Sequence, residues 1–153
     1  MRKGIEGLFL LLLFFVTVMN GLFLKDKIEM SQRKTGESQQ EYMTRWAQVN
    51  ERTEQRIRRF PTGGVAAFLG IVYFVEQYLD KDHVAGRRNQ KVALLYFLLV
   101  FIMYLGERFI VFKDLEGGWR YGTTTSYLLH NSIYLAIAFL LSALLFWRKN
   151  RNV

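Results

Sequence analysis

The chain has 153 residues, of which 51% are hydrophobic, 16% are aromatic and 22% are charged, and its formal net charge is +8. It contains no cysteine, which excludes disulfides, thiolate metal sites and thiol-based redox chemistry. Its two histidines are far apart, and it has no metal-binding spacing, glycine-rich phosphate loop or nucleophile elbow. We therefore expect no catalytic residue of a conventional kind, no metal and no cofactor.

The first apolar segment covers residues 7–24, which are 18 consecutive uncharged and mostly apolar residues. A helix needs about 20 such residues to cross a bilayer core, so we predict a span at about 5–24. Arg2 and Lys3 precede it, as in a signal peptide. The run is longer than a usual signal core, however, and residues 18–23 lack a small-x-small cleavage pattern. We expect an uncleaved span.

The polar segment that follows contains a predicted amphipathic helix at about 38–60. Ser38 and Glu41 have the spacing of a capping box. Behind them, apolar or half-apolar residues recur every three or four positions: Tyr42, Trp46, Val49, Thr53, Ile57 and Phe60. The helix should end at Phe60, because Pro61 disfavours helical geometry in the residue before it. Two placements stay open. The helix either rests on the bilayer surface or extends the next span, with its arginines facing a ligand.

The second and third spans are predicted at about 61–79 and 91–112, and both are less apolar than the first. The second carries small residues four apart, which permit close helix packing. The third carries Glu107 and Arg108 in its last third, and charges at membrane depth are costly. This pair either reaches the interface where the span ends or lines a pocket in which a cation holds an anionic head.

The fourth span is predicted at about 126–147, inside an uncharged run. The expected fold is therefore all-α: a single multi-pass integral membrane domain, residues 1–153, with a four-helix bundle and a long polar loop that carries the amphipathic helix. Lys and Arg are nearly balanced between the two sides, so the positive-inside rule does not set the orientation. In such a protein the basic residues lie beside anionic headgroups. We thus expect membrane lipids, and no nucleic acid, as partners.

Three patches in this order resemble the family of membrane-associated proteins in eicosanoid and glutathione metabolism. They are 18-VMNGLFLKDKIE-29, the stretch from Trp46-Ala47 through Arg52 to Phe60-Pro61, and 104-YLGER-108. The resemblance covers the four-span layout across most of the chain. It implies a homotrimer of four-helix protomers in an internal membrane, with ligands held between neighbouring protomers.

The glutathione-using members of that family cradle the peptide with an Arg, an Asn, an acid and tyrosines. Here Gln55 and Arg58 stand at the positions that match the Asn and the acid. Tyr104 matches one family tyrosine, whereas Val100 stands in place of the other, and the thiol-activating arginine would fall near Val111. The resemblance therefore implies a non-catalytic, lipid-binding member.

The predicted function is a non-catalytic, small polytopic membrane protein that binds a lipid or amphiphile between its helices. The candidate ligand residues are Asn20, Arg52, Tyr104, Glu107 and Arg108. The arginines would hold an anionic head, and Tyr104 would pack on the tail or donate its hydroxyl. The alternative is an accessory subunit of a larger membrane complex, which packs against a core subunit. Other membrane chains are partners in both cases, in a homotrimer or in a larger complex.

Overall fold

The computed structural model describes residues 2–79, 84–111 and 123–151, and within these residues the chain is helical and has no strand. The predicted all-helical class is confirmed. The elements in chain order are α1 (Arg2–Ser31), α2 (Gln39–Arg59), α3 (Thr62–Leu79), α4 (Val84–Gly106), the π-helical turn η1 (Glu107–Val111) and α5 (Thr123–Arg151).

Four of these helices are long and apolar enough to cross a membrane, over Lys3–Ser31, Thr62–Leu79, Arg87–Phe109 and Ser126–Trp147. Each predicted span overlaps one of them, although residue 112 of the third predicted span lies outside the described residues. α1 has 30 residues, which corresponds to about 45 Å of helix. It is thus longer than a bilayer core of roughly 30 Å requires, and its last two turns carry the charged residues of 25–29.

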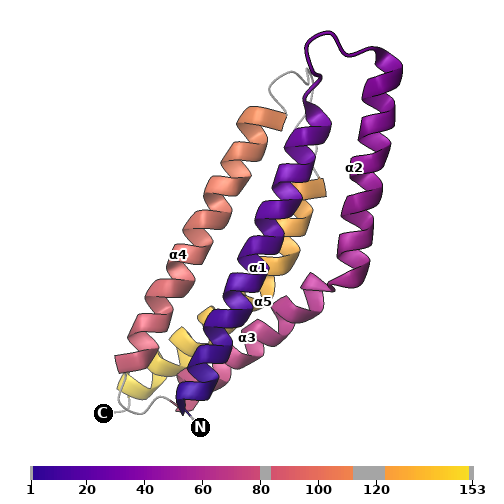
Figure 1. The fold of residues 1–153 in the computed structure, drawn as a ribbon. Coiled ribbons are helices and arrows are strands. Elements are labelled where there is room, and N and C mark those ends of the chain that lie inside the picture. Colours follow the sequence, from indigo (N-terminus) through magenta and orange to yellow (C-terminus); the bar gives the residue numbers. More distant parts are fainter. Residues whose placement is uncertain (1, 80–83, 112–122, 152–153) are drawn as a thin grey trace.

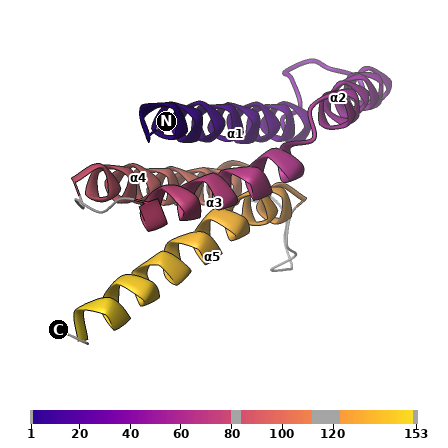
Figure 2. The same ribbon diagram turned by 90° about the horizontal axis from the view of Figure 1, so that it is seen from below.

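α1 and α3 pack together, and α3 makes its most extensive contact with α5 (Figure 1). α2 and α4 lie on opposite sides of α1 (Figure 1). α1 begins and α5 ends at the same end of the molecule. Seen from below, α5 diverges from α4 toward its C-terminal end (Figure 2). Contact between the two helices reaches along α5 as far as Phe139, whose ring centroid lies 6.0 Å from that of Phe97.

A thin apolar core joins the four long helices, and most of their remaining apolar surface is exposed. Phe9 of α1, Leu69 and Tyr73 of α3, and Leu135 of α5 are fully buried in this core. Large exposed apolar side chains lie on all four helices, and α4 is covered least by the rest of the chain. Exposed apolar surface of this extent is typical of a protein that meets lipid or another chain.

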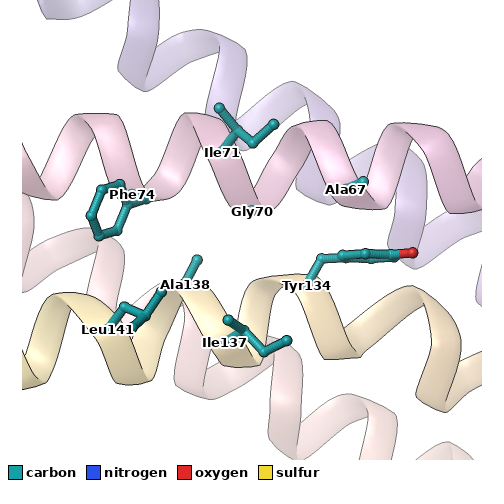
Figure 3. A pocket seen from close by; sticks show the side chains of 8 residues that line it. All are labelled: Ala67, Gly70, Ile71, Phe74, Tyr134, Ile137, Ala138 and Leu141. Atoms are coloured by element: carbon teal, nitrogen blue, oxygen red, sulfur yellow. The ribbon is translucent and has the colours of Figure 1, made fainter.

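The close approach of α3 to α5 depends on small residues. Gly70 and Ala138 lie where the two helices face each other, beside a shallow apolar groove of about 250 Å³ (Figure 3). A Cβ atom added at Gly70 would lie 2.8 Å from the Tyr134 carbonyl oxygen. A backbone oxygen cannot move away without moving α5. Gly70 therefore sets the distance between these helices, as the small-residue spacing predicted.

We expect Gly70→Ala to lower the free energy of unfolding by about 1–3 kcal/mol, the usual cost of overpacking a tight contact. The matched control is Gly64→Ala on the same helix, where an added Cβ has nothing within 4 Å. Alanine at position 64 should be neutral or stabilising, because glycine is a poor helix former. Thermal unfolding in one detergent compares the two variants. Equal melting temperatures would contradict this account of Gly70.

Two arginines close the connection between α1 and α2, and one of them, Arg33, donates to the Glu37 carbonyl oxygen (3.0 Å). Arg45 donates to the carbonyl oxygens of Glu29 (2.5 Å) and Gln32 (2.7 Å), and it forms an ion pair with Glu37 (2.8 Å). It therefore satisfies carbonyl groups that the end of a helix leaves without partners. Its hydrogen bond, together with that of the Lys34 backbone N–H, lowers the pKa of Glu37 to about 2.

The two ends of α2 follow the sequence prediction. The Ser38 and Glu41 capping box is present, with the Ser38 backbone N–H donating to the Glu41 carboxylate at 2.8 Å. Phe60 has extended geometry (φ −125°, ψ 93°) before Pro61, as expected for a residue that precedes proline. Between these ends α2 runs back beside the second half of α1 (Figure 1).

Candidate functional site

A cavity that is larger than the groove beside Gly70 lies between α4 and α5 and has a volume of about 630 Å³. This volume falls within the range of roughly 300–1,000 Å³ that is typical of small-molecule sites. Most of its lining is apolar, and the two polar side chains in its wall are Tyr104 of α4 and Ser132 of α5. The apolar lining consists of Phe97, Val100, Phe101, Leu128, Leu129, Ile133 and Ala136. A cavity of this composition suits a hydrocarbon chain with a few oxygen atoms.

A buried chain of hydrogen bonds connects the cavity wall to α1. The Asn131 Nδ2 donates to Asn20 Oδ1 (2.8 Å), and the Asn20 Nδ2 donates to the Tyr96 hydroxyl (3.2 Å). The Tyr96 hydroxyl lies 3.0 Å from Ser132 Oγ. Asn20 is 0% exposed. Buried polar groups are costly unless they are paired, so these bonds fix how α1, α4 and α5 are rotated against one another.

At the end of α4 the helix widens into the π-helical turn η1, a feature that is frequent at functional sites. The Arg108 guanidinium lies 5.3 Å from the centroid of the Tyr104 ring, which is within cation–π range. Because Tyr104 also lines the cavity, a cation lies next to one residue of the cavity wall.

Glu107, the first residue of η1, is buried. Its side chain is 1% exposed, and its charge attracts Lys27 of α1. The carboxylate is therefore packed between helices rather than exposed at the end of the span. It lies at the same end of the molecule as Arg108 but belongs to the contact of η1 with α1.

Arg52 belongs to a separate charged cluster between α1 and α2. It forms ion pairs with Glu29 (2.9 Å) and Asp26 (3.3 Å) of α1. Asp26 is 2% exposed and also accepts from Arg56 (2.7 Å) and Thr53 (2.9 Å). A carboxylate with three donors holds α2 against the end of α1. Arg52 thus serves the attachment of α2, and its role toward a ligand stays a prediction.

A third polar cluster lies at the opposite ends of the helices. Arg88 of α4 pairs with Glu6 of α1, and Asn89 of α4 donates to Glu76 of α3. Asn89 and Glu76 are both buried. These contacts fix the start of α4, and its second half, from Phe97 to Tyr104, borders the cavity.

The structure brings two of the five predicted residues, Tyr104 and Arg108, into contact, and Tyr104 lines the cavity. A third, Asn20, reaches the cavity through Tyr96 and Ser132. Sequence reasoning missed Ser132, Tyr96 and Asn131 as polar partners. The only signal for them was a polar residue within an apolar run, and that signal does not show which neighbour it meets.

Comparison of the chain with known protein families, with characterised proteins and with solved structures finds no match.

Proposed function

We propose that this chain is a multi-pass integral membrane protein that holds one lipid or amphiphile in the cavity between α4 and α5, without catalysing a reaction. The observation that carries the proposal is the cavity itself. It is large enough for a ligand, is lined mainly by hydrocarbon, and has Tyr104 and Ser132 as its polar wall residues. The tail of the ligand would lie along the apolar residues of the two helices.

The Arg108 guanidinium next to Tyr104 supports an anionic head for this ligand. Hydrogen bonds from arginine to a carboxylate or phosphate are charge-assisted and stronger than neutral ones. A hydrocarbon tail gains little when it moves from the bilayer into an apolar cavity, because lipid tails are as apolar as leucine. Affinity should therefore depend mainly on the polar contacts and on the fit of the chain.

The resemblance to membrane-associated proteins in eicosanoid and glutathione metabolism agrees with a ligand-binding member of this kind. Within that family the resemblance is to the five-lipoxygenase-activating protein. The relationship is part of the proposal, as are the four-helix bundle and a homotrimer in an internal membrane. The exposed apolar face of α4 offers a surface on which a neighbouring protomer could pack beside the cavity.

A second candidate function rests on the same face of α4. Leu95, Leu98 and Ile102 are all more than half exposed, so a different, larger subunit could cover them. The chain would then be an accessory subunit of a membrane complex. The mass of the gently extracted assembly distinguishes the two functions. A homotrimer with bound lipid supports the first, and recovery only with other polypeptides supports the second.

The ligand proposal is tested by binding of a photoactivatable long-chain fatty acid, with the neutral alcohol of the same length as the comparison probe. We expect Arg108→Gln to reduce labelling by the acid about tenfold, because a hydrogen bond to a charged group contributes about 1.5–3 kcal/mol. Labelling by the alcohol should not change. The control is Arg58→Gln on α2, whose guanidinium is largely exposed and is 3.8 Å from Glu54.

A second variant keeps this test decisive if Arg108→Gln unfolds. Ala136→Phe fills the cavity from α5, whereas Ala143→Phe makes the same change at an exposed position of that helix. The first should reduce labelling by both probes about tenfold, since overpacking costs about 1–3 kcal/mol. The second should leave labelling unchanged. Full labelling of folded Ala136→Phe would overturn the proposed site.

A further inference from the structure

We infer that Ser132 donates a hydrogen bond to an acyl carbonyl of the bound ligand, which makes that ligand a single-chain acyl glycerophosphate rather than a free fatty acid. This inference rests on the proposed function, because it concerns the same cavity. It adds a second polar contact, deeper in the site than the anionic head.

The donor role of Ser132 toward a ligand follows from the directions of the buried hydrogen bonds around it. Asn20 uses its Oδ1 to accept from Asn131, so its Nδ2 donates to the Tyr96 hydroxyl. Tyr96 is 3% exposed, and its own hydroxyl hydrogen needs an acceptor. Ser132 Oγ, at 3.0 Å, is the acceptor that the described residues provide. Tyr96 is then the donor in this pair, and Ser132 is the acceptor.

This direction leaves the hydroxyl hydrogen of Ser132 for another acceptor. Ser142, on the same helix, donates to the backbone carbonyls of Ala138 (2.8 Å) and Phe139 (3.0 Å). Among the described residues, Ser132 has no such bond to its own helix, and its bond is with Tyr96. Because Ser132 lines the cavity, a ligand oxygen is well placed to accept its hydrogen.

The spacing of the polar groups identifies the chemical class. Ser132 lines the cavity and lies 3.0 Å from the Tyr96 hydroxyl. Tyr104, which also lines the cavity and contacts Arg108, follows Tyr96 by eight residues of α4, which corresponds to about 12 Å of helix. A ligand with its anion at Arg108 thus needs a second acceptor further along its chain. An acyl glycerophosphate has one, its ester carbonyl, whereas the only oxygens of a fatty acid are in its head.

The experiment measures two probes on the purified full chain in nanodiscs of phosphatidylcholine. One is 1-oleoyl-glycerol-3-phosphate, and the other is its 1-O-alkyl ether analogue, which lacks the carbonyl. We expect the wild-type protein to bind the ester about five- to tenfold more tightly, the usual range for one buried hydrogen bond. Ser132→Ala should abolish this preference. Ser142→Ala, a serine of similar burial whose bonds stay within its helix, should keep it.

The outcomes separate this inference from the function on which it rests. Equal binding of ester and ether by the wild-type protein would overturn the role of Ser132 while leaving the lipid site intact. Binding of neither probe, nor of the photoactivatable fatty acid, would refute the lipid site itself. The comparison of ester with ether in the wild-type protein needs no variant, so it decides the question even if Ser132→Ala does not fold.

Discussion

Replacement of Asp26 by alanine is expected to release the second half of α2 from α1. The Asp26 carboxylate is 2% exposed and accepts from Arg52, Thr53 and Arg56. Removing one member of a buried ion pair typically costs about 3–5 kcal/mol. Arg52 is half exposed and can regain water. We therefore expect a cost near the lower limit, about 3 kcal/mol.

Amide hydrogen exchange measures this release directly. A loss of about 3 kcal/mol should speed exchange about a hundredfold over 49–59. The first turns of α2 should change less, because the Arg45 contacts with Glu29, Gln32 and Glu37 remain. Glu29→Ala is the matched control. The Glu29 side chain is 35% exposed and pairs with Arg52, so its loss should cost less than about 1 kcal/mol. Unchanged exchange in Asp26→Ala would show that apolar contacts alone hold α2.

The helices were predicted well from the sequence because the interactions that start, extend and end a helix act between residues close together in the chain. An uncharged run of spanning length, a capping box at Ser38 and a proline at position 61 each act within a few residues. The continuation of α1 to Ser31 was not predicted. Charges at residues 25–29 look like the end of a span, and the sequence alone does not show that α2 returns to neutralise them.

The candidate site depends on contacts between residues far apart in the chain, which explains why it was predicted only in part. Asn20 meets Asn131 across 111 positions, and this contact depends on how α1 and α5 are rotated. A lone asparagine in an apolar run can lie at the membrane–water interface or in a buried hydrogen-bonded pair, and the sequence looks the same in both cases. Arg108 was selected as a candidate because a charge at membrane depth is costly enough to be conspicuous, whereas a serine such as Ser132 is not.

The Asn20 network is expected to contribute to stability in a way that a double substitution reveals. Asn20→Leu removes the acceptor for Asn131 and the donor to Tyr96. The Asn131 amide is then buried without that partner, which costs about 1–3 kcal/mol. Hydrogen bonds between membrane helices average only about 0.6 kcal/mol in measured cycles. Most of the expected loss is therefore the cost of the polar group left behind.

Asn20→Leu combined with Asn131→Leu should then recover most of the lost stability, because two apolar groups replace both partners. Unfolding in one detergent gives the interaction energy from the wild-type protein, the two single variants and the double variant. We expect each single variant to lose about 1–2 kcal/mol and the double variant to lose less than the sum of the two. Strict additivity would contradict a direct Asn20–Asn131 bond. A double variant that regains stability but no longer prefers the ester over the ether would show that the pair is retained to orient Tyr96 and Ser132 toward the ligand.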